Sequence, residues 1–372
     1  MRLLPSIEIA TRLTRAGKLA EAMATLTGTA PAGEAGTPPQ TPREALARPR
    51  RVLEAGLGTV IGRLAGGGSL ASRDSRHGPS PVPEGASFTE RHMASPVGLT
   101  YKLFIPSRAG AEPLPLLVML HGCTQSPDDF AAGTRMNERA EAEGFYVAYP
   151  AQTRAANAQK CWNWFRAVDQ GRRGEPALIV AMTGEIMRSE NVDPTRVYVA
   201  GLSAGGAAAA VLGQNYPEVF AAVGVHSGLA CGAATDMSSA FSAMKGGSVV
   251  PVAGAAVPTI VFHGDRDGTV APINGHQVVA QAKSAGPLTA HAETAAAPGG
   301  VTYTRTIQTD GGGRPMSEQW VLHGAGHAWS GGDPAGSYTD PRGPDASLAM
   351  LRFFRQHASS KQPGEPTTRQ AV

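Results

Sequence analysis

Near its middle the chain reads Val197-Tyr198-Val199-Ala200-Gly201-Leu202-Ser203-Ala204-Gly205-Gly206, and this stretch carries the strongest indication of the fold. Its first four residues form an apolar run that favours a buried strand, and an alanine-rich run typical of a helix follows it. Between them lies the pattern Gly-x-Ser-x-Gly, whose small residues allow a tight turn that exposes the Ser203 hydroxyl at the end of the strand. The pattern alone occurs by chance in a chain with 46 glycines. Its place between a strand and a helix is what predicts that Ser203 is a nucleophile.

Short apolar runs alternate with helical patterns on both sides of this stretch. Such alternation favours a mostly parallel central sheet with helices on both faces. Together with the serine between strand and helix, it predicts an α/β-hydrolase fold. The expected strands are Tyr101–Ile105, Leu116–Leu120, Tyr146–Tyr149, Val197–Ala200, Ala222–His226, Thr259–His263 and Gln319–Leu322, and the expected helices are Asn137–Glu143, Pro176–Ser189, Ala204–Gln214, Asn274–Ala285 and Asp345–His357.

The first 85 residues differ in composition from the rest. Residues 1–28 place apolar side chains at helical spacing, so we expect an amphipathic helix that docks on the body of the protein or on a second copy, giving a homo-oligomer. Residues 29–85 are rich in Gly, Pro and Ala and cannot bury enough apolar area to offset the entropy of ordering, so we expect a largely disordered linker. We expect the catalytic domain at 86–358 and a disordered tail at 359–372.

Charge, hydropathy and cysteine content exclude several classes of protein. Residues 86–372 carry 22 basic and 23 acidic side chains, so we expect no nucleic-acid partner. No stretch approaches the ~18 consecutive apolar residues of a transmembrane segment, and the N-terminus lacks the apolar core of a cleaved signal peptide. The three cysteines lack the paired spacing of a zinc site, and they leave room for one disulfide bond and one free thiol.

A serine nucleophile needs a base and an acid, and in this fold they follow it in the order acid, then histidine. One expected strand is followed by a loop containing Asp265 and Asp267, and another is followed by a loop containing His323 and His327. Catalytic groups of α/β sheets gather at the carboxyl ends of the strands. We expect Asp267 to be the acid and His327 the base, with Asp265 and His323 as the respective alternatives.

The oxyanion of an acyl-transfer reaction needs two hydrogen-bond donors. One should be the backbone amide of Ala204, the residue after the nucleophile, and the other should come from a loop after an early strand. The strand ending at Leu120 runs into His121-Gly122-Cys123-Thr124-Gln125, so we expect the Cys123 amide to be the second donor. An ordinary strand-ending turn is the competing interpretation.

Five motifs, in this order, resemble those of the short-chain polyhydroxyalkanoate depolymerase family of esterases, which is related to feruloyl and acetylxylan esterases. The resemblance covers about residues 88–357. The motifs are His121-Gly122-Cys123-Thr124-Gln125, Cys161-Trp162-Asn163-Trp164-Phe165, Gly201-Leu202-Ser203-Ala204-Gly205-Gly206, His263-Gly264-x-x-Asp267-x-x-Val270 and Gly326-His327-Ala328-Trp329-Ser330-Gly331-Gly332.

The resemblance implies hydrolysis of poly(3-hydroxybutyrate) or a similar short-chain ester through an acyl-enzyme, with no metal or organic cofactor. It assigns the same nucleophile, acid, base and oxyanion amides as the residues themselves. Cys123 and Cys161 are the candidate disulfide pair, which would fix the oxyanion loop against the tryptophan loop. Candidate substrate-binding residues are Gln125, Trp162, Trp164 and Trp329, with core packing as the competing interpretation for the tryptophans.

Two other functions remain open at this point. A feruloyl or acetylxylan esterase acting on plant polysaccharide would use the same motifs, and a catalytically inactive hydrolase-fold binding protein would keep the fold alone. The expected partner is an ester substrate, in monomeric or polymeric form. The compartment is not indicated by the residues, although many members of the family that the chain resembles are extracellular.

Overall fold

The computed structural model describes residues 82–93, 98–248, 257–282 and 286–359. The predicted N-terminal helix, most of the predicted linker and nearly all of the predicted tail lie outside these residues. Within them, no helix is both long and apolar enough to cross a membrane.

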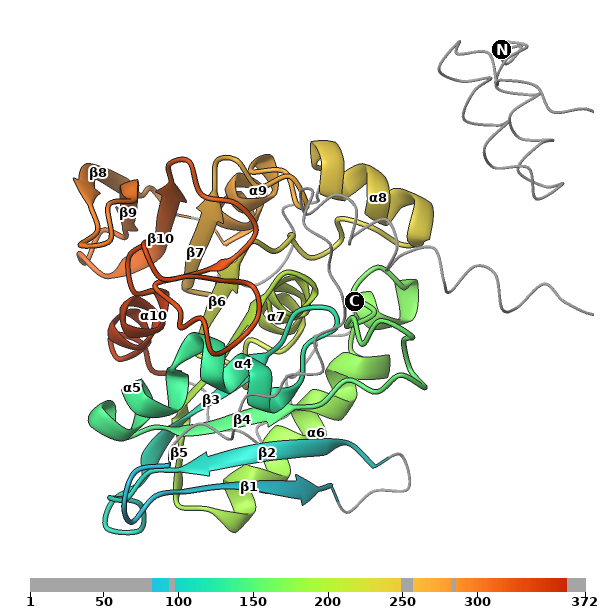
Figure 1. Cartoon of the computed structure of the whole chain (residues 1–372), viewed down its shortest axis with the longest axis vertical. Coiled ribbons are helices and arrows are strands. Elements are labelled where there is room, and N and C mark those ends of the chain that lie inside the picture. Colours follow the sequence, from blue (N-terminus) through green and yellow to red (C-terminus); the bar gives the residue numbers. More distant parts are fainter. Residues whose placement is uncertain (1–81, 94–97, 249–256, 283–285, 360–372) are drawn as a thin grey trace, which may run out of the picture. The chain divides into compact units, whose positions relative to one another are not determined.

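A central sheet of ten strands organises the described part of the chain (Figure 1). Their order across the sheet is β1-β2-β4-β3-β5-β6-β7-β10-β9-β8. The strands are β1 (Ser87–His92), β2 (Thr100–Ile105), β3 (Leu114–Leu120), β4 (Tyr146–Pro150), β5 (Val192–Leu202), β6 (Ala222–His226), β7 (Thr259–Gly264), β8 (Thr289–Ala296), β9 (Thr302–Thr309) and β10 (Pro315–Leu322), and a separate short pair is formed by β11 (Trp329–Ser330) and β12 (Thr339–Asp340).

The middle of the sheet is parallel and its two edges are antiparallel. The six strands from β4 to β10 pair in parallel, whereas β1 and β2 at one edge and β9 and β8 at the other pair antiparallel. The register aligns the carboxyl ends of neighbouring strands: Leu202 of β5 lies opposite His226 of β6, and Leu322 of β10 lies opposite Gly264 of β7. The loops that follow these strands therefore start from one edge of the sheet.

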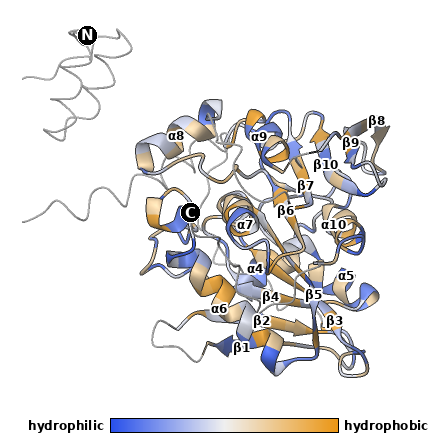
Figure 2. Cartoon of the chain, turned by 180° about the vertical axis from the view of Figure 1, so that it is seen from behind, coloured by the Kyte–Doolittle hydropathy of each residue, from blue (hydrophilic) through white to orange (hydrophobic). Residues whose placement is uncertain are grey.

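Helices cover both faces of the sheet. The apolar side chains of α6, α7, α8 and α9 join one core cluster, and those of α4, α5 and α10 join the other. Alternate residues of β5 supply both clusters, with Val197 and Val199 in the first and Tyr198 and Ala200 in the second, which is why the central strands are largely hydrophobic (Figure 2). The helices are α4 (Pro127–Thr134), α5 (Met136–Glu143), α6 (Gly174–Ser189), α7 (Ala204–Asn215), α8 (Met237–Gly246), α9 (Ile273–Gln281) and α10 (Ala346–Phe354), with a 3-10 turn, η1, at Ala167–Gln170.

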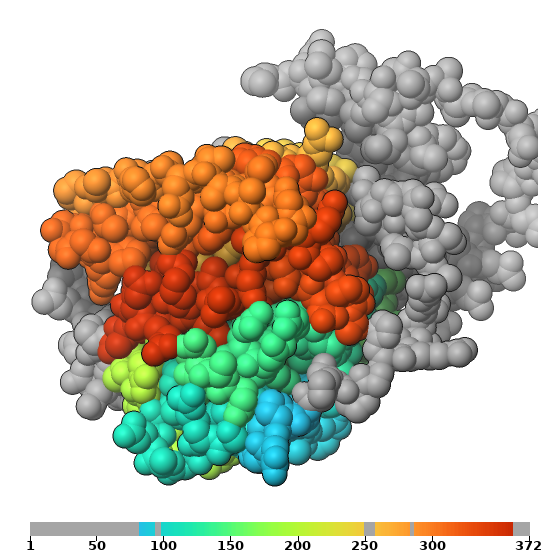
Figure 3. All heavy atoms as spheres, turned by 60° about the vertical axis from the view of Figure 1, so that its left-hand side comes forward, coloured from blue at the N-terminus to red at the C-terminus, as the bar shows by residue number. Residues whose placement is uncertain are grey.

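The predicted α/β-hydrolase fold is confirmed, and within the described residues each predicted strand and helix has a counterpart. Two helices end earlier than predicted, α9 at Gln281 and α10 at Phe354. The sequence did not predict the β8–β9 hairpin, because all eight residues of β8 are exposed and its apolar residues are all alanines, which are depleted in strands. The hairpin lies at the outer edge of the sheet and contributes to the orange surface in Figure 3.

Candidate active site

Ser203 lies between β5 and α7 in a conformation that non-glycine residues rarely adopt. Its φ is 58° and its ψ is −119°, and its backbone N–H donates to the carbonyl of His226 at 2.9 Å. The turn is so tight that a Cβ on Gly205 would lie 2.0 Å from the carbonyl oxygen of Leu120. Only glycine lets α7 approach β3 this closely, and this approach brings the start of the helix to the oxyanion loop.

Asp267 and His327 form a hydrogen-bonded pair between the loops that follow β7 and β10. His327 Nδ1 lies 2.7 Å from Asp267 Oδ2, and Asp267 Oδ1 accepts the backbone N–H groups of Thr269 and Val270 at 2.9 and 2.8 Å. Burial would raise the pKa of Asp267, but the hydrogen bond from His327 and the other nearby donors hold it below its usual value. The carboxylate therefore stays ionised and fixes the orientation of the imidazole.

The alternative residues Asp265 and His323 pair with each other instead. His323 Nδ1 lies 3.0 Å from Asp265 Oδ2, and each of these two side chains is 37% exposed. The side chain of Asp267, in contrast, is fully buried and that of His327 is 10% exposed. The described residues thus contain two such Asp–His pairs, and the buried one is bonded to a residue lining the pocket around Ser203, since Asp267 accepts the backbone N–H of Val270.

Some backbone N–H groups of the loop after β3 already donate a hydrogen bond, and others do not. Gly122 N–H donates to Gln125 Oε1 at 2.9 Å, and Thr124 N–H donates to the carbonyl of Gln159 at 2.6 Å. The amides of Cys123 and Ala204 have no acceptor among the described residues. These two are free to bind an oxyanion.

A small pocket that opens to solvent adjoins Ser203. The Cys123–Cys161 disulfide bond forms part of its wall and ties the oxyanion loop to the tryptophan loop. The lining is mostly apolar. The lining residues are Cys123, Cys161, Trp164, Phe165, Ser203, Ala204, Leu229, Ala240, Met244 and Val270.

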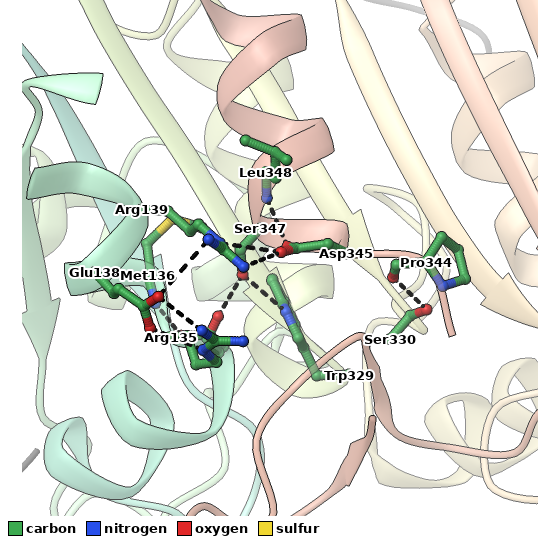
Figure 4. Close-up of polar contacts among 11 residues, drawn as sticks. Arg135, Met136, Glu138, Arg139, Trp329, Ser330, Pro344, Asp345, Ser347 and Leu348 are labelled. Carbon is green, nitrogen blue, oxygen red and sulfur yellow. Dashed lines mark hydrogen bonds and ion pairs between the residues drawn. The ribbon is translucent and has the colours of Figure 1, made fainter. Parts of the chain in front are cut away.

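Of the four candidate substrate-binding residues, only Trp164 lines this pocket. Trp162 is 1% exposed and packs beside His121, and Trp329 is 1% exposed with its indole N–H donating to Ser347 of α10 (Figure 4). These two side chains belong to the hydrophobic core, Trp162 to the first cluster and Trp329 to the second.

Gln125 is also a structural residue rather than a pocket residue. Its amide oxygen accepts from Gly122, and its amide nitrogen donates to Asp129 and to Ser337. With both ends of its amide engaged, this buried side chain braces the oxyanion loop against the segment that follows His327.

Several residues around the site were missed by the sequence analysis. Leu229, Ala240 and Met244 line the pocket, and Ala240 and Met244 lie on α8, a helix that we did not predict. His226 lies between the nucleophile loop and the base loop, and the sequence showed it only as the last residue of a strand. Contacts of this kind depend on which loops meet, so no local pattern could have revealed them.

The Ser203 hydroxyl makes no hydrogen bond within the described part of the chain. Bonds between nucleophile and base are often long in a free enzyme and shorten when substrate binds. The described ranges also contain no cluster of three or more His, Cys, Asp or Glu that could hold a metal ion.

Proteins that the chain resembles in sequence are named depolymerases and esterases. Poly(3-hydroxyalkanoate) depolymerase C of Paucimonas lemoignei is 33% identical over 228 residues, which cover 57% of this chain and 54% of the relative. Feruloyl esterase B of Neurospora crassa is 33% identical over 153 residues, covering 40% and 51%. The chain thus spans about half the length of the curated relatives it matches.

A solved structure and a family model complete the comparison. The acetyl xylan esterase from Aspergillus awamori has the same fold, with a TM-score of 0.56 at 18% identity over 72% of this chain and 99% of that one. The family model described as esterase PHB depolymerase matches residues 99–299. The chain belongs to the esterase PHB depolymerase family.

Proposed function

We propose that the protein is a serine carboxylic-ester hydrolase that cleaves short-chain 3-hydroxyalkanoate esters through an acyl-enzyme. The observation that carries the proposal is the buried Asp267–His327 pair, held at 2.7 Å and sharing a loop with Val270, which lines the pocket beside Ser203. The strained turn at Ser203 and the two unoccupied amides of Cys123 and Ala204 supply the other parts that acyl transfer needs.

The reaction proceeds in two steps. The Ser203 hydroxyl oxygen attacks the ester carbonyl while His327 takes its proton, and the negative charge that forms on the carbonyl oxygen is held by the amides of Cys123 and Ala204. His327 then gives the proton to the departing alcohol, which leaves the acyl group on Ser203. A water molecule, deprotonated by His327, attacks this second ester and releases the acid together with free serine.

The pocket favours a small apolar acyl group. Its walls are aliphatic and aromatic, and the lining side chains carry few polar groups, namely the Ser203 hydroxyl and the indole N–H of Trp164. This favours a hydroxybutyrate-type ester over a feruloyl ester. The relatives named poly(3-hydroxyalkanoate) depolymerase and poly(3-hydroxybutyrate) depolymerase support the same choice, and those named feruloyl or acetylxylan esterase give the competing substrates.

Two measurements test this proposal. Ser203→Ala should lower turnover of a soluble butyrate ester at least ~10³-fold with unchanged folding, because the nucleophile is lost while the oxyanion amides remain. A variant that keeps more than a tenth of the activity would remove Ser203 from the reaction. Parallel assays on amorphous poly(3-hydroxybutyrate), a feruloyl ester and acetylated xylan should give the highest kcat/KM with the hydroxybutyrate substrate, and a clear preference for either other substrate would replace the substrate assignment.

A further inference from the structure

His226 contacts both halves of the candidate active site. Its backbone carbonyl accepts the N–H of Ser203 at 2.9 Å, and its ring Nε2 accepts the N–H of Ser330 at 3.0 Å. Ser330 lies three residues after His327, on the loop that carries the base. One residue at the end of β6 is therefore bonded to the nucleophile turn through its main chain and to the base loop through its side chain.

We propose that His226 is a positioning residue that holds the His327 loop at a fixed distance from Ser203. This inference rests on the proposed function, since it assigns a role within the same reaction. His226 touches no substrate in this scheme, and its effect passes through Ser330 to His327.

The hydrogen bonds define the protonation state of the His226 ring. Because Nε2 accepts from Ser330, it carries no proton, and the proton resides on Nδ1, which lies 3.2 Å from the hydroxyl of Ser227. The ring is fully buried and stacks between Phe262 and Trp329, with centroids 5.7 and 5.1 Å away. A protonated ring would turn an N–H toward the N–H of Ser330, so the contact requires neutral histidine.

The surroundings of the ring keep it neutral. Burial, followed by the nearby His263 and His327, lowers the pKa of His226 to about 3, although Asp267 acts in the opposite direction. His226 thus stays uncharged throughout the pH range in which an esterase works. It can hold the loop while adding no charge that competes with His327 for Asp267.

The base loop is fixed on its other side as well. The hydroxyl of Ser330 donates to the carbonyl of Pro344, as Figure 4 shows, and the N–H of Trp329 donates to the carbonyl of Tyr338 at 2.7 Å. These bonds tie the loop to segments near α10, whereas the bond to His226 ties it to the centre of the sheet. A misplacement of about 1 Å between reacting groups can cost ~10²-fold in rate, so losing this central bond should lower kcat.

Two substitutions by side-chain amides test whether the acceptor must lie at the position of Nε2, because Gln and Asn carry the same polar group on side chains of different length. The side-chain oxygen of His226→Gln extends to about the position of Nε2 and can still accept from Ser330, whereas that of His226→Asn reaches only to about the position of Nδ1. With p-nitrophenyl butyrate we expect His226→Gln to keep kcat within about tenfold of the native value. His226→Asn should lower kcat roughly 100-fold with KM within about threefold.

The matched controls are His357→Gln and His357→Asn. His357 is also buried, 3% exposed, but neither of its ring nitrogens has a hydrogen-bond partner among the described residues, and it lies after α10 away from the pocket. Both control variants should keep native kcat and KM. A fluorophosphonate that labels Ser203 should react more slowly with His226→Asn than with His226→Gln, in the same ratio as the kcat values.

Each outcome bears on the inference. Equal kcat values for His226→Asn and His226→Gln would overturn the inference. A His226→Gln protein that folds but is as inactive as Ser203→Ala would also overturn it, because that result would give His226 a direct chemical role. If His226→Asn does not fold, Ser330→Pro removes the same bond from the donor side, and it must lower kcat relative to Ser330→Ala, which keeps the N–H. Full activity in Ser203→Ala would instead contradict the proposed function.

Discussion

At the residue scale, the sequence distinguished two nearby aspartates but not the orientations of two nearby tryptophans. The order of nucleophile, acid and base favoured Asp267 and His327, and in the structure these two side chains meet at 2.7 Å. The orientation of the tryptophans could not be predicted, because Trp162 and Trp164 lie in the same short motif. In the folded loop, Trp162 packs in the core and Trp164 lines the pocket.

The two Asp–His pairs give a matched test of the acid. Asp267→Asn should lower kcat/KM for p-nitrophenyl butyrate by several orders of magnitude, because an amide would favour the wrong tautomer of His327. Asp265→Asn should change it little, since Asp265 bonds the exposed His323. The reverse ranking, in variants with native melting temperatures, would give the role of the acid to Asp265.

At the scale of elements, buried strands were predictable and exposed ones were not. The strands from β3 to β7 are recognisable in the sequence as apolar runs, because both faces of the sheet are covered there. β8 and β9 lie beyond β10, where one side of the sheet edge meets solvent, and their polar residues resemble a loop. The loops that carry the candidate catalytic residues follow β5, β7 and β10, whose carboxyl-terminal halves are mostly buried, and this is where the sequence signal is strongest.

The Cys123–Cys161 disulfide bond joins the loops after β3 and β4 across 38 residues. The loop-entropy relation gives such a bond roughly 3–4 kcal/mol of stability, so a reductant should lower the free energy of unfolding by about that amount. Alkylation of the unfolded, unreduced protein should modify one cysteine, Cys231, as read by intact mass. Three modified cysteines would show that the bond is not formed.

At the scale of the whole molecule, buried histidines make stability depend on pH. Burial lowers the pKa of His121 to about 4, of His226 to about 3 and of His357 to about 4, whereas an exposed histidine in the unfolded chain titrates near ~6.5. Below pH ~6.5 the unfolded chain therefore binds protons that the folded protein does not. The free energy of unfolding should fall as pH decreases from about 6.5 toward 4, and it should be fully retained above that window.

Urea unfolding at several pH values checks this prediction. His357→Leu removes one of the three histidines, so the loss of stability on acidification should become shallower by up to ~1.4 kcal/mol per pH unit. His357 is suited to this test because its ring makes no hydrogen bond within the described residues. An unfolding free energy that stays constant from pH 7 to pH 5 would contradict the prediction.

Residues 1–85 contain none of the candidate site residues, and the family match begins only at residue 99. Deleting them should leave turnover of a soluble short-chain ester within about threefold of the full chain. Light scattering on both proteins would test the predicted role of the N-terminal segment in self-association. A large loss of soluble-ester turnover would mean that this segment completes the active site.

The close approach at Gly205 has a consequence for how the protein tolerates mutation. A Cβ there would meet the carbonyl oxygens of Leu120 and His121 at 2.0 and 2.6 Å, so even alanine would push α7 away from β3. That movement would separate the amide of Ala204, at the start of α7, from that of Cys123, in the loop after β3. A survey of random substitutions should thus find Gly205→Ala more harmful than replacement of a large exposed residue such as Val168. The position without a side chain is then one of the most constrained in the chain.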